Sequence, residues 1–162
     1  MLGAKTIGTD GGGAPLYKYN AAHTTGADGV LAIDDVEWDT YTITKGASES
    51  GLSVVEACPF QPFGLNPGIS QIVDFIFTPA SSHSLLVYVT NDQNVPLENA
   101  SVRLTRTGYD ETIDSSSCGQ SFFRGLSATT YTLDVSASGF TTQNVTGLSV
   151  SGATTYSILL NP

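Results

Sequence analysis

The sequence predicts an all-β protein built from two tandem small β-sandwiches, the first of which lacks its N-terminal strand or strands. Thr, Val, Tyr, Phe and Gly are common, strong helix formers are scarce, and no apolar pattern keeps a helical period. Short alternating apolar runs recur between clusters of turn residues, which is typical of a sandwich. The chain also repeats itself, because residues 28–43 align without gaps on residues 118–133.

The repeat predicts the same corner in both halves of the chain. Each copy has a glycine, Gly29 or Gly119, and a tyrosine twelve positions later, Tyr41 or Tyr131. We expect the glycine to supply the positive φ of a turn. The tyrosine is expected to pack its ring while its hydroxyl reaches the backbone of the corner.

The second half, residues 81–162, has the signals of a complete sandwich. Turn residues separate its apolar runs, among them the Asn-Asp-Gln-Asn cluster that starts at Asn91 and a corner at Gly139. The runs predict short strands at residues 85–89, 102–105, 109–114, 121–123, 131–135 and 157–160.

The first half, residues 1–80, is predicted to be an incomplete copy of the second. Both halves end in a strand that Pro terminates, but 28 residues precede Gly29, whereas 34 residues span Leu85 to Cys118. We interpret residues 5–7 as the end of a strand whose beginning is missing. An open sheet edge of this kind predicts strand donation or self-association, and the alternative is a compact variant or a cloning boundary.

Charge and composition exclude several classes of partner. The chain has 162 residues, with 15 acidic and 6 basic side chains and a formal net charge of −9. So few scattered cations cannot neutralise phosphates, which excludes nucleic acids and anionic membranes. No basic and then apolar leader opens the sequence, and no run approaches the length of a membrane span. We therefore expect a longer secreted or surface protein whose signal or anchor lies outside this segment.

Three motifs in residues 84–162 carry a resemblance to known domains. They are the strand at 85–90 with the following segment Asn-Val-Pro-Leu-Glu-Asn-Ala, the Gly119 turn, and Gly125-Leu126 ahead of Tyr131. With them, the second half resembles the carboxypeptidase regulatory-like and Cna-B-like domains, which are transthyretin-like or Ig-like β-sandwiches of bacterial secreted or surface proteins. Residues 5–79 resemble the same group with its first strands missing.

The resemblance implies a structural role. Such domains usually act as stalks, spacers or adhesive modules. Some Cna-B-like members form an isopeptide bond between Lys and Asn or Asp, but all three lysines of this chain lie in its first half. The second half therefore cannot form the bond. In the first half Lys18 and Asp74 are the pair to consider, and the strand that normally brings the lysine is absent.

The two cysteines, Cys58 and Cys118, fall one in each half. In an acidic, strand-rich chain of secreted type they predict a disulfide that clamps the two modules. Closing sixty residues of chain corresponds to roughly 4 kcal/mol in the loop-entropy treatment. The alternatives are two free thiols or pairing with segments outside this chain.

The sequence favours neither catalysis nor a bound cofactor. His23 and His83, the only histidines, do not neighbour a nucleophile motif. Carboxylates gather between Asp34 and Asp39, but successive residues of a strand point to opposite faces, and the spacing is not that of a calcium loop. No metal site is expected, because two Cys and two His lie far apart in sequence.

Exposed aromatic residues provide the rival to a purely structural role. Trp38 lies at the corner where the second half has only Ala128, and Tyr17 and Tyr19 could extend a platform on which sugars stack. The alternative is that Trp38 seals the end of the sandwich. We therefore expect a non-enzymatic structural or adhesive module, and the second hypothesis is a carbohydrate-binding accessory module of a secreted enzyme. The partners expected are glycans or other surface proteins.

Overall fold

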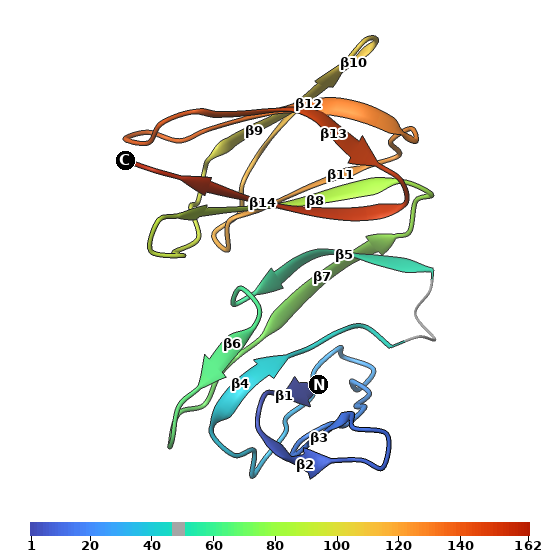
Figure 1. The fold of residues 1–162 in the computed structure, drawn as a ribbon, viewed down its shortest axis with the longest axis vertical. Coiled ribbons are helices and arrows are strands. Elements are labelled where there is room, and N and C mark those ends of the chain that lie inside the picture. Colours follow the sequence, from blue (N-terminus) through green and yellow to red (C-terminus); the bar gives the residue numbers. More distant parts are fainter. Residues whose placement is uncertain (47–50) are drawn as a thin grey trace. The chain divides into compact units, whose positions relative to one another are not determined.

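The computed structural model describes residues 1–46 and 51–162. Within these ranges the regular secondary structure consists of β-strands and includes no helix (Figure 1). The all-β class predicted from the sequence is confirmed. In the same ranges, no helix has the length and apolar character needed to cross a membrane. The chain divides into two compact units, one made of Met1–Glu49 with Gln61–Val73 and the other of Ser50–Phe60 with Asp74–Pro162.

The second unit holds two sheets that together form a sandwich (Figure 1). The neighbours within both sheets are antiparallel, except that β8 and β14 run parallel. One sheet has the order β10 (Tyr109–Asp114), β9 (Ser101–Arg106), β12 (Thr129–Ser136), β13 (Gln143–Val150), and the other β11 (Gln120–Arg124), β8 (Ser84–Asn91), β14 (Ala153–Leu160).

Alternation along the strands builds the core of this sandwich. Successive side chains point to opposite faces, so β8 sends Leu85, Val87 and Val89 into the interior, all fully buried. Phe123 of β11 joins them from the neighbouring strand. Full burial of side chains of this size stabilises the fold by about 1.5–3 kcal/mol each.

A separate antiparallel pair of strands, β5 (Leu52–Cys58) with β7 (Asp74–Pro79), also belongs to the second unit. Its register shifts between Val54 and Glu56, which marks a bulge. The backbone of Ala57 points away from β7, where its N–H donates to Oε1 of Gln120 at 3.0 Å and its carbonyl accepts from Nε2 at 2.7 Å. A side-chain amide of the second unit therefore occupies the outer edge of β5.

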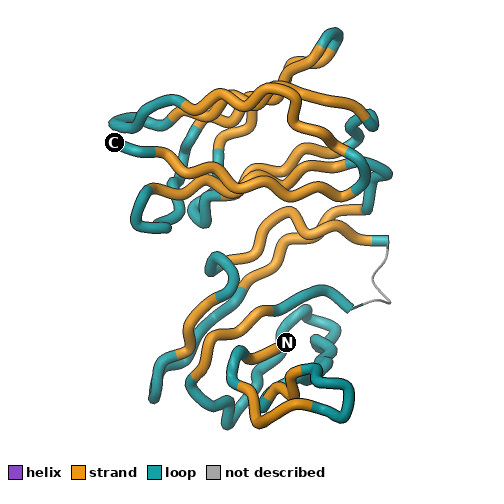
Figure 2. The backbone as a smooth tube through the Cα atoms, viewed as in Figure 1, coloured by secondary structure: helices purple, strands orange, loops and turns teal. Residues whose placement is uncertain are grey.

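The first unit has a three-stranded sheet in the order β1 (Leu2–Gly3), β4 (Asp39–Thr42), β6 (Phe63–Leu65). A hairpin of β2 (Thr6–Thr9) and β3 (Pro15–Tyr17) stands beside it, exposed along both strands. Residues 21–38 contain no strand (Figure 2). The buried side chains are few, and Tyr41 and Phe63 are the large ones.

The two compact units do not meet at residues 80 and 81, where the sequence predicts the domain boundary. The strand pair of β5 and β7 groups with the second unit, because the amide of Gln120 at the start of β11 and a disulfide to Cys118 hold β5 there. Two tandem modules, with the first incomplete, stay a prediction.

Candidate functional site

The corner before β4 presents the aromatic and charged residues of the first unit. Asp35 has a positive φ of 55°, which turns the chain, and the buried Tyr41 donates its hydroxyl hydrogen to the carbonyl of Glu37 at 2.6 Å. Burial raises the pKa of Tyr41, and the negative charges of Asp39 and Glu37 add to this effect. The corner therefore keeps a neutral, hydrogen-bonded tyrosine beneath a charged surface.

Trp38 lies on this corner with 56% of its surface exposed. The Nζ of Lys5 is 3.1 Å from the centre of its ring, a cation–π contact. The same Nζ donates to the Trp38 carbonyl at 2.5 Å and to Oε1 of Glu37 at 3.1 Å. Lys5 thus covers one face of the indole, and a ligand would have to use the other face or displace the ammonium.

Glu37 is the centre of the charge pairing around the corner. Its second oxygen binds Nζ of Lys18 at 2.5 Å, while its first binds Lys5. Hydrogen bonds from Lys18 and then from Lys5 lower the pKa of Glu37. Asp39 accepts from the backbone N–H of Lys5 at 2.9 Å. Sequence reasoning did not identify these pairs, because no local spacing pattern links their residues. Lys5, for example, is more than thirty residues from both Glu37 and Asp39.

A cleft of about 200 Å³ opens beside these groups. Tyr19 forms part of it, with its ring edge-on to Tyr41 and its hydroxyl 2.8 Å from Nε2 of His23. The lining residues are Lys18, Tyr19, Asp35, Glu37, Asp39 and Tyr41. The lining thus combines two tyrosine side chains with charged donors and acceptors.

The three aromatic residues predicted to bind a ligand have different positions. Tyr19 lines the cleft, whereas Trp38 and Tyr17 are not part of its lining. Tyr17 is the last residue of β3 and is 37% exposed. Ligand binding by the three residues stays a prediction.

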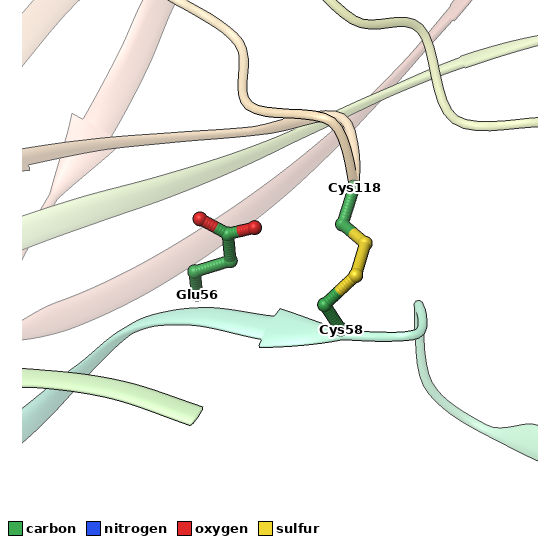
Figure 3. A group of neighbouring side chains, drawn as sticks. All are labelled: Glu56, Cys58 and Cys118. Carbon is green, nitrogen blue, oxygen red and sulfur yellow. A yellow bond between two sulfur atoms is a disulfide. The ribbon is translucent and has the colours of Figure 1, made fainter. Parts of the chain in front are cut away.

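A disulfide joins Cys58 to Cys118, with 5.7 Å between their Cα atoms (Figure 3). Cys58 ends β5, and Cys118 lies in the turn that leads to β11. Both cysteines belong to the second unit. The bond therefore ties the β5–β7 strand pair to the sandwich within that unit, whereas the sequence predicts a clamp between the two halves of the chain.

The carboxylate of Glu56 lies beside this disulfide (Figure 3). One ligand atom from each of Glu56, Cys58 and Cys118 lies within 4.8 Å of the others. Among the described residues, this is the one group of three or more His, Cys, Asp or Glu side chains with such spacing. Sequence reasoning missed Glu56, although a Glu two residues before a Cys on a strand shares its face.

The residues considered for catalysis or cross-linking have other contacts. His23 is bound to the hydroxyl of Tyr19, and Lys18 is paired with Glu37. Asp74, the acceptor considered for an isopeptide bond, opens β7 opposite Cys58.

The second half of the chain matches a known family. Residues 84–161 match the carboxypeptidase regulatory-like domain, which confirms the resemblance drawn from the motifs of this half. The match does not include residues 1–83. No curated protein matches the chain.

Solved bacterial structures match part of this chain at low identity. The TIE protein of Bacillus anthracis is 11% identical with a TM-score of 0.42, over 56% of this chain and 20% of that protein. A type II cohesin–X-dockerin complex from Acetivibrio cellulolyticus is 18% identical with a TM-score of 0.39, over 48% of this chain and 56% of the other. A candidate carbohydrate-binding protein from Bacteroides uniformis is 16% identical with a TM-score of 0.41, over 49% of this chain and 41% of that protein.

Proposed function

We propose that this chain is a non-catalytic spacer or adhesive module of a bacterial secreted or cell-surface protein. The family match of residues 84–161 supports a β-sandwich module, and the disulfide fits an oxidising compartment outside the cell. The acidic surface, with a net charge of −9, would keep repeated modules soluble and apart.

The observation that carries the spacer role is the pairing of the first and last strands of the sandwich. β8 and β14 are parallel neighbours, paired from Ser84 and Ala153 to Asn91 and Leu160. A force that pulls the start of β8 away from the end of β14 acts along both strands in opposite directions. It therefore loads all the hydrogen bonds between the two strands at the same time. Because each hydrogen bond contributes only about 0.5–1.5 kcal/mol, resistance to force comes from breaking many together.

Single-molecule stretching of the full chain tests this role. Handles at Ser84 and Asn161 shear the β8–β14 ladder, whereas handles at Asp92 and Asn161 open it from one end, one pair at a time. We expect a markedly higher rupture force in the first geometry. Equal rupture forces in the two geometries would contradict a mechanical function.

A second candidate function is glycan binding in the first unit. It is favoured by the exposed Trp38 on the corner whose neighbours Glu37 and Asp39 line the cleft. Indole and phenol rings supply apolar faces for sugar rings, while the charged groups of the cleft can bond to hydroxyls.

A glycan array with the full chain tests the second candidate. We expect Trp38→Ala to abolish binding and Ile7→Ala, which also alters an exposed apolar residue of the first unit, to leave it unchanged. An array on which the unaltered chain binds nothing argues for the spacer role alone.

We also propose that the first unit associates with a second copy of the chain through residues 30–34. Val30 and Leu31 are 65% and 41% exposed there, and the segment has no strand partner. The aligned segment of the second half is β11, which pairs with β8. The backbone of Val30 bonds to Gly26 and Asp28, whereas residues 31–34 lie in no strand and carry the exposed Leu31. Such a segment is open to strand addition.

Sedimentation equilibrium over a range of concentrations tests this association. We expect a dimer that Leu31→Lys weakens and Leu159→Lys does not, since Leu159 is similarly exposed but lies on β14 in the second unit. A monomer at every concentration would refute the proposal.

A further inference from the structure

The side chains around the disulfide form a cluster with the composition of a metal site. Glu56 and Cys58 are two residues apart on β5 and therefore share a face of the strand. Cys118 meets them from the turn before β11 (Figure 3). The three ligand atoms lie within 4.8 Å of one another, close enough for a single ion to contact all of them.

The donor set selects the class of ion. Two thiolates and a carboxylate are ligands that zinc accepts, at about 2.3 Å for sulfur and about 2.0–2.2 Å for oxygen. The Cα atoms of the two cysteines are 5.7 Å apart, so small side-chain rotations can bring both sulfurs to one ion. Hard cations such as calcium prefer oxygen ligands and would find only one side chain here.

The carboxylate of Glu56 is available for a ligand. Within the described residues it has neither an ion pair nor a hydrogen bond, in contrast to Glu37 and Asp110, which are bound to basic side chains. It is partly buried beside the disulfide.

The position of β5 does not depend on the disulfide alone. The buried amide of Gln120, which is 4% exposed, makes two hydrogen bonds to the backbone of Ala57, the residue next to Cys58. Its Nε2 also donates to the carbonyl of Cys118 at 3.3 Å. The same side chain thus holds both cysteine-bearing segments, and it can keep them together after the sulfur–sulfur bond is broken.

We infer that reduction of the Cys58–Cys118 disulfide converts this cluster into a zinc site with Glu56 as the third protein ligand. A dithiol reductant supplies two electrons and two protons, becomes a disulfide itself, and leaves two cysteine thiols. Zinc then binds the two sulfurs, their protons pass to solvent, and water completes a tetrahedron. In the oxidised form the sulfurs are bonded to each other and no thiolate exists. The site is therefore gated by the redox state, independently of the spacer role.

Metal titration of the full chain tests the inference. The chain is reduced with a dithiol, freed of reductant without oxygen, and titrated with zinc by calorimetry and with cadmium by its thiolate charge-transfer absorption. We expect one equivalent of metal to bind to the reduced chain and none to the oxidised chain. Stoichiometric binding to both forms, or to neither, overturns the inference.

Two variants separate the three-ligand site from a simple pair of thiols. We expect Glu56→Gln to weaken zinc binding by at least about 10-fold, the lower end of the loss seen even for outer partners of metal ligands. Glu98→Gln, an exposed acid of the same unit, is expected to bind zinc like the unaltered chain. Equal affinity of the Glu56→Gln and Glu98→Gln variants would exclude Glu56 as a ligand and overturn the inference. Far-ultraviolet circular dichroism of each reduced variant verifies that the strands persist.

Discussion

The corners that precede Tyr41 and Tyr131 are alike in backbone and unlike in surroundings. Both tyrosines are buried, and each binds the backbone four residues earlier, at Glu37 and at Ser127. Asp35 and Gly125, at the same position in the two copies, both have positive φ. The strands that follow, β4 and β12, also begin at the same position.

The segments just before the two corners differ completely. In the second half this segment is β11, which pairs with β8 and sends Phe123 into a closed core. In the first half residues 30–34 form no strand, and Val30 and Leu31 are exposed. The comparison teaches that a corner is a local structure that its own residues can form, whereas a second layer of a sandwich requires a neighbouring strand.

The largest expected difference concerns the aligned positions of Phe123 and Ile33. Phe123→Ala is expected to cost about 3–5 kcal/mol of the unfolding free energy of the second unit, because it empties a buried site. Ile33→Ala is expected to cost far less, because Ile33 is only partly buried. Denaturant unfolding measures both, with Trp38, the one tryptophan, reporting on the first unit by fluorescence and circular dichroism on the whole chain. Equal losses of unfolding free energy in the two variants would contradict the difference between the two segments.

The two corner glycines should differ next most. Both have positive φ, 77° at Gly29 and 68° at Gly119. A Cβ at Gly119 would meet the carbonyl oxygen of Val89 at 2.5 Å, whereas one at Gly29 meets nothing within 4 Å. We expect Gly29→Ala to cost about 1–2 kcal/mol for the left-handed backbone alone. Gly119→Ala adds about 1–3 kcal/mol for crowding. The thermal unfolding of the two variants tests this order, and a Gly29→Ala loss as large as that of Gly119→Ala would contradict it.

The corner tyrosines should behave alike. Tyr41→Phe and Tyr131→Phe each remove a hydroxyl bonded to the backbone while keeping the ring. We expect a loss of about 1 kcal/mol in both, which is the net value of one such hydrogen bond. Denaturant midpoints of the two variants measure it. A loss confined to Tyr131→Phe would show that the first corner does not depend on its tyrosine.

The smallest expected effect is electrostatic and compares exposed ion pairs of the two units. Lys18 and Lys5 lower the pKa of Glu37, and Arg103 lowers that of Asp110. A carboxyl with a lowered folded pKa contributes stability above its ordinary pKa and loses it as the pH falls through the folded value. Both contributions should therefore disappear in acid.

Carboxyl titrations followed by nuclear magnetic resonance test these pairs. We expect Lys18→Ala to raise the pKa of Glu37 toward its ordinary value and to leave Asp110 unchanged, with Arg103→Ala doing the reverse. Because both pairs are exposed, neither variant should shift the unfolding midpoint much. An unchanged pKa of Glu37 in the Lys18→Ala variant would show that Lys5, and not Lys18, lowers it.

Parts of the candidate sites could be read from the sequence. Cys58 and Cys118 were identified as a pair because a strand-rich, acidic chain with two cysteines is typical of secreted domains. Trp38 was identified because it interrupts a repeat that has Ala128 at the same place. The contact of Lys5 with the Trp38 ring could not be predicted, since it joins residues 33 positions apart through a sheet that is itself a tertiary feature.

By itself the sequence determined the all-β class, the corners and six of the seven strands of the second half, because alternation, turn residues and a gapless repeat are local signals. It did not predict β13 at residues 143–150, because the end of this range was interpreted as a turn before the last strand. The tertiary structure alone decided that β5 and β7 pack with the second unit, that the disulfide lies inside that unit, and that Glu56 stands beside it. The physical reason is that an edge strand is held by whichever backbone groups and side chains face its free hydrogen bonds. Here that partner is the amide of Gln120, 63 residues along the chain from Ala57.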